Sequence, residues 1–196
     1  MWGQALLLLI VVALSGSAAV IALIGAGRGN QRLFLRAGVA SLVIGAAYGA
    51  LIIGVALTAP EKYLRNGEEK YICELDCHLA YSIAGVQWRG DSLSVRLNVR
   101  FAEERISNRR AVGAPLYPGA RTVSLRGNDG TRYRPLSLGD LSRTLRPGES
   151  YQTELVFAVP RGASGLVLYV ADADPTKMLL VGSDNAPFRL PVGFQL

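Results

Sequence analysis

The two cysteines of this chain stand four residues apart, and its single histidine follows the second of them, in Cys73-Glu-Leu-Asp-Cys77-His78. In an extended strand the two Cα atoms would be about 13 Å apart, too far for a disulfide, whereas a helical turn brings them to about 6 Å. A tight turn is compatible with the polar residues in this segment. In an oxidising compartment we therefore favour a structural disulfide between Cys73 and Cys77.

The same three side chains leave other chemistry open. Cys-x-x-x-Cys-His is one residue longer than the c-type haem motif, in which two thioethers hold the haem and the histidine ligates the iron. In that hypothesis Met178 is the distal ligand. A zinc or copper site would use Cys73, Cys77 and His78, although a fourth ligand is not evident. A redox-active thiol pair is the remaining hypothesis.

The other motifs do not indicate an enzyme. The G-x-G-x-G spacing at 25–29 differs from that of a dinucleotide-binding loop. Arg89-Gly90-Asp91 matches an adhesion tripeptide but stands where a hairpin turn is expected, and Asp172-Ala-Asp174-Pro175 lacks further calcium ligands. Because His78 is the sole imidazole and no G-x-S-x-G motif is present, we expect no catalytic triad. The sequence predicts neither catalytic residues nor a small-molecule substrate.

Two long apolar segments must be placed before any of these residues can be positioned. Neither Trp2 to Gly27 nor Ala37 to Pro60 contains a charged side chain. At about 1.5 Å per residue, each can cross a hydrocarbon layer of about 30 Å as a helix. We predict transmembrane helices at about 3–26 and 37–59, because a segment in lipid must satisfy its own backbone hydrogen bonds. No Lys or Arg precedes the first segment, which opposes a cleaved signal peptide.

The predicted loop 28–36 carries Arg28, Arg32 and Arg36 and no acidic residue. By the positive-inside tendency this loop is cytoplasmic, which places the C-terminal part in the periplasm and makes the chain a multi-pass inner-membrane protein. The basic residues of the 61–70 linker weigh against this orientation. The three arginines then anchor the cytoplasmic side, and Trp2 and Tyr63 anchor the outer side.

Small residues recur every fourth position along the second helix. They form two grooves, offset by about 100° around the helix, and the residues are Ser41, Gly45 and Gly49 in one and Ala46, Ala50 and Gly54 in the other. Close backbone approach is a main source of helix pairing in lipid, so we expect one groove to hold the first helix and the other to be open to a partner. With no charged residue inside either helix, transport by this chain alone is not expected.

Beyond these helices the composition is that of an ordinary globular domain. All 15 acidic residues lie at or after Glu61, so the positive mean hydropathy of +0.26 comes from the first third of the chain. This distribution excludes a disordered chain, a collagen and a cysteine-dense mini-protein. We expect a membrane hairpin at 1–60, a linker at 61–70 and one domain at 71–196.

Alternation of apolar and polar residues predicts the fold of that domain. In Ser92–Phe101 every second residue is apolar, which is the pattern of a half-buried strand. Turn signals such as Asn128-Asp129-Gly130 separate similar segments, and the pattern predicts an antiparallel β-sandwich of immunoglobulin-like type. The further predicted strands are 78–88, 121–126, 131–136, 151–159, 166–170 and 178–181.

The segment Arg146-Pro-Gly-Glu-Ser-Tyr-Gln-Thr-Glu-Leu-Val-Phe-Ala-Val-Pro160 carries a family resemblance. It resembles the late strands of a bacterial extracellular immunoglobulin-like family of unknown function, often carried by lipoproteins, with a Pro-Gly-Glu turn before a Leu-Val-Phe strand that ends in Pro. The resemblance is close in this segment and loose over 70–185, and two apolar helices replace the lipobox cysteine. It implies an extracytoplasmic β-sandwich and no catalytic residues.

Together these features predict a non-catalytic, membrane-anchored accessory subunit that binds other membrane-protein subunits and the lipid bilayer. A narrower hypothesis places it in a respiratory or photosynthetic electron-transfer complex. The arginines of 105–146 are interpreted as solvated faces near headgroups or as a surface for an acidic protein, and nucleic acid is not an expected partner. The alternatives are a redox protein built on Cys73, Cys77 and His78, and a free-standing envelope sensor or adhesin.

Overall fold

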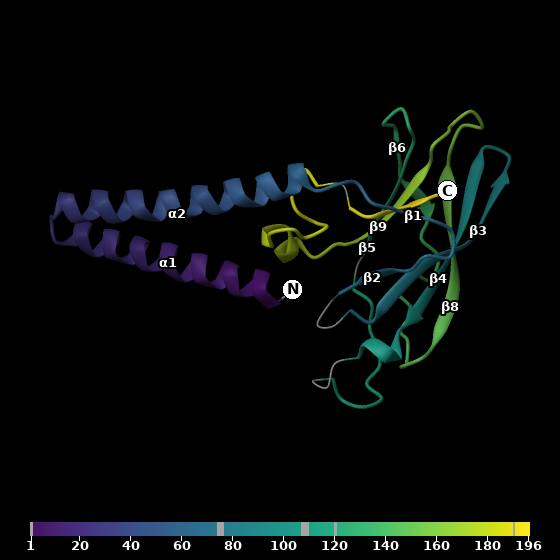
Figure 1. Cartoon of the computed structure of the whole chain (residues 1–196), viewed down its shortest axis with the longest axis horizontal. Coiled ribbons are helices and arrows are strands. Elements are labelled where there is room, and N and C mark those ends of the chain that lie inside the picture. The colour runs from purple at the N-terminus through teal and green to yellow at the C-terminus, as the bar shows by residue number, and fades with distance from the viewer. Residues whose placement is uncertain (1, 74–76, 107–109, 120, 190) are drawn as a thin grey trace. The chain divides into compact units, whose positions relative to one another are not determined.

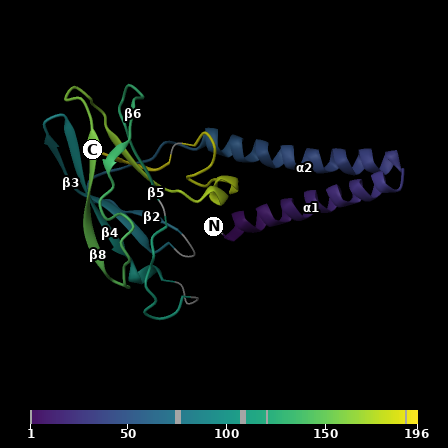
Figure 2. The same cartoon turned by 180° about the vertical axis from the view of Figure 1, so that it is seen from behind.

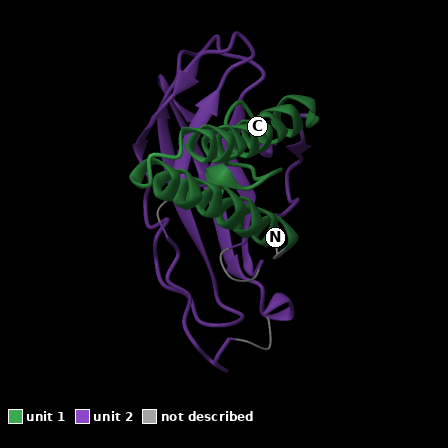
Figure 3. Ribbon diagram, turned by 90° about the vertical axis from the view of Figure 1, so that its left-hand side faces the viewer, with its two compact units in different colours: residues 1–60, 175–189 green, residues 61–174, 190–196 purple. Residues whose placement is uncertain are grey.

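The computed structural model describes residues 2–73, 77–106, 110–119, 121–189 and 191–196. The chain divides into two compact units, shown in different colours in Figure 3. The first unit contains residues 1–60 and 175–189, and the second contains 61–174 and 190–196. Each unit is described by itself below.

The first unit contains two long helices, α1 (Trp2–Gly27) and α2 (Gln31–Thr58), both long and apolar enough to cross a membrane. Helix α2 begins six residues before its predicted start at 37, because the Asn30 side chain caps it by accepting a hydrogen bond from the Leu33 N–H (3.1 Å). The predicted loop 28–36 is therefore too long. Arg32 and Arg36 lie on α2, since arginine is a good helix former and does not end a helix.

On the least exposed face of α1, the side chains become smaller toward the loop. Its residues repeat at spacings of three and four, the period of a helix-packing seam, and run in order Leu8, Val11, Ser15, Ala18, Ala22 and Gly25. A Cβ atom at Gly25 would lie 2.8 Å from the Phe34 nitrogen, so only glycine fits where the chain turns. The two helices are closest at the loop and diverge away from it (Figure 1).

The second unit is a mostly antiparallel β-sheet domain that resembles a β-sandwich, as predicted. Two five-stranded sheets have the orders β1-β10-β9-β5-β6 and β2-β3-β4-β8-β7, and only the β1–β10 pair is parallel among the described strands. The bounds are β1 (Tyr63–Leu64), β2 (Lys70–Ile72), β3 (Leu79–Arg89), β4 (Ser92–Phe101), β5 (Arg121–Arg126), β6 (Arg132–Tyr133), β7 (Pro135–Ser137), β8 (Ser150–Ala158), β9 (Val167–Asp172) and β10 (Gly193–Gln195), with 3-10 helices η1 (Glu103–Arg105) and η2 (Pro175–Leu179).

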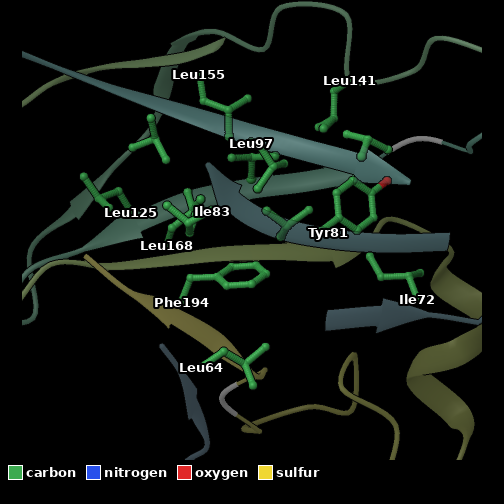
Figure 4. Close-up of a cluster of buried hydrophobic side chains, with 14 of the residues drawn as sticks. Leu64, Ile72, Tyr81, Ile83, Leu97, Leu125, Leu141, Leu155, Leu168 and Phe194 are labelled. Atoms are coloured by element: carbon green, nitrogen blue, oxygen red, sulfur yellow. The ribbon is translucent and has the colours of Figure 1, made fainter. Parts of the chain in front are cut away.

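The core lies between the two sheets. Strand β4 pairs with β3 on one side and β8 on the other, and all three run side by side in Figures 1 and 2. Its alternating apolar residues are fully buried, which confirms the predicted pattern, and Leu97 packs in one cluster with Leu168 and Phe194 of the opposite sheet (Figure 4). The cluster is the largest single source of apolar burial in the described residues.

Three sequence predictions about this domain are wrong. Residues 178–181 form no strand, because η2 and the turns after it take the segment into the helical unit, so the predicted domain 71–196 is interrupted at 175–189. The 61–70 linker is partly ordered and contains β1 and the start of β2. The predicted strand 131–136 is divided into β6 and β7, which belong to different sheets.

Candidate functional site

Cys73 and Cys77 form a disulfide, with 3.9 Å between their Cα atoms. This confirms the favoured interpretation of the cysteine pair, and residues 74–76 between them lie outside the described part of the chain. In the oxidised form neither sulfur is available for a thioether bond to haem or as a thiolate ligand, because both of those need a free thiol.

The structure places His78 in the core of the sandwich instead of beside a ligand site. Its side chain is buried, and its ring packs on Phe101 with 4.8 Å between the ring centroids. Arg110 Nη1 lies 3.4 Å from His78 Nε2, where it can donate to a neutral imidazole. Met178, the predicted distal haem ligand, lies in η2 of the other unit.

The predicted haem or metal set of Cys73, Cys77 and His78 is therefore not assembled. No group of three or more His, Cys, Asp or Glu residues in the described part of the chain is arranged to hold a metal ion. The physical reason is that the two cysteine sulfurs are joined to each other, whereas the imidazole of the adjacent His78 packs beside the Phe101 ring. The three side chains therefore do not face one common site. Sequence spacing alone could not show this packing.

The two remaining motifs, Arg89-Gly90-Asp91 and Asp172-Ala-Asp174-Pro175, form turns. Gly90 has a φ of +62° between β3 and β4, and its carbonyl accepts from Arg161 Nε (3.2 Å), which also lies 3.8 Å from Asp91 Oδ1. Asp172 Oδ1 accepts from the Asp174 N–H at 3.0 Å, forming the Asx turn that short side-chain carboxylates favour. Both segments are held by their own turn geometry, as the sequence indicated.

A buried polar cluster was missed by the sequence analysis. The Arg121 side chain is 1% exposed, lies 3.6 Å from Asp172 Oδ1, and donates from Nε to the Tyr81 hydroxyl at 3.1 Å. Burial raises the pKa of the nearby Tyr151 hydroxyl to about 12. The alternation did contain a signal, because Arg121 shares its strand face with Val123 and so had to point inward.

An open pocket of about 610 Å³ borders this cluster. It is lined by Arg121 and the loop 138–143, which contributes one carboxylate and one further guanidinium, Asp140 and Arg143. Arg121 is paired with Asp172, and the carboxylate of Asp140 balances the guanidinium of Arg143 in formal charge, so the pocket has no excess charge of either sign.

Lys70 is a second buried charge that the sequence analysis misplaced in the linker. Its Nζ donates to the carbonyl oxygens of Val170 (2.9 Å) and Val192 (2.8 Å), which are far from it in the chain. Buried ammonium groups need such acceptors to offset lost hydration. Lys70 therefore ties β2 to the opposite sheet and does not lie free at a membrane end.

The strongest surface ion pair joins β2 to β4. Arg100 donates from Nε and Nη2 to the two carboxylate oxygens of Glu69 at 2.9 and 2.8 Å, a bidentate arrangement. These hydrogen bonds hold the pKa of Glu69 below its usual value. Glu104 pairs with Arg100 from the solvent side, and Arg105 lies over the Tyr71 ring at 3.7 Å. The cluster ties Glu69, the residue before β2, to the end of β4.

The first predicted groove of α2 consists of Ser41, Gly45 and Gly49. Ser41 Oγ donates to the Ser15 carbonyl at 3.1 Å, but a Cβ atom at Gly45 or Gly49 would meet nothing within 4 Å. The prediction left open which groove holds the first helix, and Ser41 is the member of this groove that bonds to α1 in the described contacts. The less exposed face of α2 comprises Leu33, Ala37, Gly38, Ser41, Ile44, Tyr48, Gly49, Ile52, Val55 and Ala56.

The second predicted groove, Ala46, Ala50 and Gly54, is exposed along its whole length. A Cβ atom at Gly54 also meets nothing within 4 Å. Together with the exposed Gly45, this leaves small residues of both grooves uncovered by the described residues of the chain.

No family model and no curated protein matches the chain. Among solved structures, it is similar to the secreted protein MPT63 from Mycobacterium tuberculosis, with 14% sequence identity and a TM-score of 0.44. The match covers 59% of this chain and 93% of that protein. A likeness at this level carries no conclusion about function.

The predicted anchors take the following places. Tyr63 is exposed on β1, and its hydroxyl donates to Glu61, a hydrogen bond that raises the pKa of Tyr63 to about 12. Arg28, Arg32 and Arg36 are exposed around the turn between the helices. The Trp2 side chain lies outside the described part of the structure. That these residues anchor the chain in lipid stays a prediction.

Proposed function

We propose that this chain is a non-catalytic accessory subunit of a membrane protein complex. Its two helices span the inner membrane, and its immunoglobulin-like sandwich lies on the periplasmic side, where it binds neighbouring subunits. The observation that carries the proposal is the outward surface of the helices, on which Leu23 and Leu42 are 70% and 72% exposed. Exposed apolar surface of this extent on two long helices is the mark of a lipid-facing segment.

The charges support a periplasmic sandwich. Arg28, Arg32 and Arg36 gather around the turn between the helices, where positive charge favours the cytoplasmic side. Lys70 counted against this orientation in the sequence, but it is buried in the sandwich and does not act as a membrane-flanking charge. A disulfide between Cys73 and Cys77 suits an oxidising compartment.

The uncovered small residues of α2 support a helical partner. In lipid, a second helix gains stability mainly from close van der Waals packing, which glycine and alanine permit. Because Gly45 and Gly54 are exposed and a Cβ atom at either would meet nothing within 4 Å, a partner helix can approach the α2 backbone there. The sandwich then presents its loops to the soluble parts of the same partner.

Extraction of the tagged full-length chain in a mild detergent tests this proposal. We expect defined partner proteins to co-purify with the wild-type chain and to be lost from the Gly45→Ile variant, which alters an exposed glycine of α2. Gly16→Ile on α1 is the matched control, because a Cβ atom there also meets nothing within 4 Å. Recovery of the wild-type chain alone, in the state expected of a free-standing sensor or adhesin, would overturn the proposal.

The narrower proposal of an electron-transfer complex is tested in the same material. It expects the co-purifying fraction to absorb visible light through haem or another redox centre of the partner subunits. A colourless fraction with defined partners would retain the accessory-subunit proposal and exclude this narrower form.

A further inference from the structure

The segment 175–189 leaves the sandwich between β9 and β10 and packs on α2 (Figure 3). The Tyr48 hydroxyl donates to the Leu179 carbonyl at 2.7 Å. Ala186 forms a buried cluster with Ile52 and Ala56, against which Val181 also packs. A 15-residue excursion is long for a connection between neighbouring strands, and it is held against an apolar helix.

The position of this contact along α2 sets its depth. Helix α2 has 28 residues and is about 42 Å long, whereas the hydrocarbon layer is about 30 Å thick. If Arg36 lies at the inner headgroups, about 20 residues of helix bring the outer boundary near Ala56. The stretch that the segment contacts, Tyr48 to Ala56, then lies in the outer part of the layer and at its boundary.

Three large apolar side chains of the segment are exposed. Met178, Leu179 and Phe188 are 44%, 54% and 74% exposed, although Val181 and Ala186 of the same segment are covered. In water this exposure costs free energy, since each side chain leaves apolar surface uncovered. Next to a lipid-facing helix, the same surface is covered by acyl chains.

The backbone of the segment is suited to such a position. Four successive turns in it close with backbone hydrogen bonds, from Leu180 N–H to Lys177, from Ser183 N–H to Leu180, from Ala186 N–H to Ser183 and from Arg189 N–H to Ala186. These bonds reduce the number of polar groups that must stay in contact with water or headgroups, which is the condition at the boundary of the bilayer. Arg189 also pairs with Asp184 at 3.6 Å and donates to the Gly182 carbonyl, so its charge is partnered at headgroup level.

We infer that 175–189 is an interfacial segment, inserted into the outer boundary of the bilayer with Met178, Leu179 and Phe188 in contact with lipid. The inference rests on the proposed membrane placement of α1 and α2. Charged groups at Lys177, Asp184 and Arg189 fit this level, because the interface accepts charged groups beside apolar ones. The segment thereby fixes the depth of the outer ends of the helices.

Nitroxide scanning of the full-length chain in vesicles of phosphatidylcholine and phosphatidylglycerol tests the inference. Labels are placed at single new cysteines, Leu179→Cys and Phe188→Cys, while Cys73 and Cys77 stay oxidised. Leu42→Cys on the outward face of α2 is the lipid reference, and the fully exposed Val112→Cys in the sandwich unit is the aqueous reference. We expect the ratio of oxygen to nickel-chelate collisions at 179 and 188 to exceed that at 112 severalfold.

The possible outcomes separate the two proposals. If labels at 179 and 188 match that at 112 while the label at 42 reports lipid, the interfacial segment is overturned and the membrane hairpin stands. If the label at 42 also matches that at 112, both proposals fail. Protection of 179 and 188 from oxygen and nickel alike, which indicates a covering protein, also overturns the inference. The Met178→Cys variant repeats the measurement where either label disturbs the segment.

Discussion

The two units of this chain use the same residue types in opposite ways. Leu97 of the sandwich is fully buried, whereas Leu42 of the hairpin is 72% exposed. The interior of the sandwich is built from large apolar side chains, but the seam between the helices contains Ser15, Ser41 and Ala18. With the helices in lipid, as we propose, this inversion follows from the solvent, since a leucine gains free energy from leaving water and gains little from leaving lipid.

The units also differ in how they hold polar groups. The sandwich buries full charges, but each is given partners, as Arg121 is by Asp172 and Tyr81. The hairpin has no charged residue along its seam, and its interhelical polar contact among the described residues is the neutral Ser41–Ser15 hydrogen bond. A charge without a partner is costly in either interior, and only the sandwich supplies carboxylates and carbonyls to offset that cost.

The largest effect that tests this comparison is expected in the sandwich core. Leu97→Ala removes a fully buried side chain from the middle of β4, and we expect a loss of about 3 kcal/mol in the free energy of unfolding. Leu136→Ala on β7 is the matched control, because that side chain is mostly exposed and should cost less than about 0.5 kcal/mol. Denaturant unfolding of the full chain in detergent, followed by near-ultraviolet circular dichroism, measures both. Equal losses would show that the sandwich core does not pack as described.

The corresponding substitution in the hairpin is Leu14→Arg. Leu14 lies near the middle of α1 and is exposed, so the charge would face lipid, at a cost of about 2.5 to 3.5 kcal/mol for membrane insertion. Leu136→Arg again serves as the control, and it should insert as the wild type does. Resistance of the chain to carbonate extraction reports the difference. If Leu14→Arg stays in the membrane fraction as fully as Leu136→Arg, that face of α1 does not meet lipid.

Patterns that repeat along the chain predicted the structure well. The alternation in β4, the hairpin at Asn128–Gly130 and the two long helices depend on local periodicity and turn chemistry, which sequence shows directly. The disulfide was the favoured prediction for Cys73 and Cys77, because a tight turn brings two cysteines at this spacing within bonding distance.

Features that depend on distant packing were not predictable in the same way. The sequence predicted a strand at 178–181. In the structure, Val181 packs against the buried cluster of Ile52 and Ala56, whereas Met178 and Leu179 are exposed. His78 seemed available as a ligand until Phe101 and Arg110 were found beside it. The face of α2 that packs on α1 was not predicted, because complementarity belongs to a pair of helices and is not visible in the sequence of one of them.

A smaller, pH-dependent effect is expected at the Glu69–Arg100 ion pair of the sandwich. Because the folded pKa of Glu69 lies below its unfolded value of 4.5, the pair stabilises the fold above that pH, and the contribution is lost as the pH falls toward the folded pKa. Glu69→Gln should therefore cost about 1 kcal/mol at pH 7, after allowing for partial exposure, and almost nothing once Glu69 is protonated.

Unfolding curves of the full chain at several pH values check this expectation. Glu103→Gln is the control, since the ion-pair partners of Arg100 in the described part of the chain are Glu69 and Glu104 and not this exposed carboxylate in η1. Its difference from the wild type should stay near zero at every pH. A Glu69→Gln difference that persists unchanged into acid would mean that the side chain contributes through packing and not through its charge.

The smallest effect is expected at the hydrogen bond between the helices. Ser41→Ala removes the bond to the Ser15 carbonyl, and interhelical hydrogen bonds in membranes average about 0.6 kcal/mol because the separated helices find other partners. Thr58→Ala is the control, since Thr58 bonds only to carbonyls of its own helix in the described contacts. Unfolding in mixed micelles measures the difference. A loss larger than that of Glu69→Gln at pH 7 would reverse the ranking, and would show that polar contacts contribute more in the hairpin than in the sandwich.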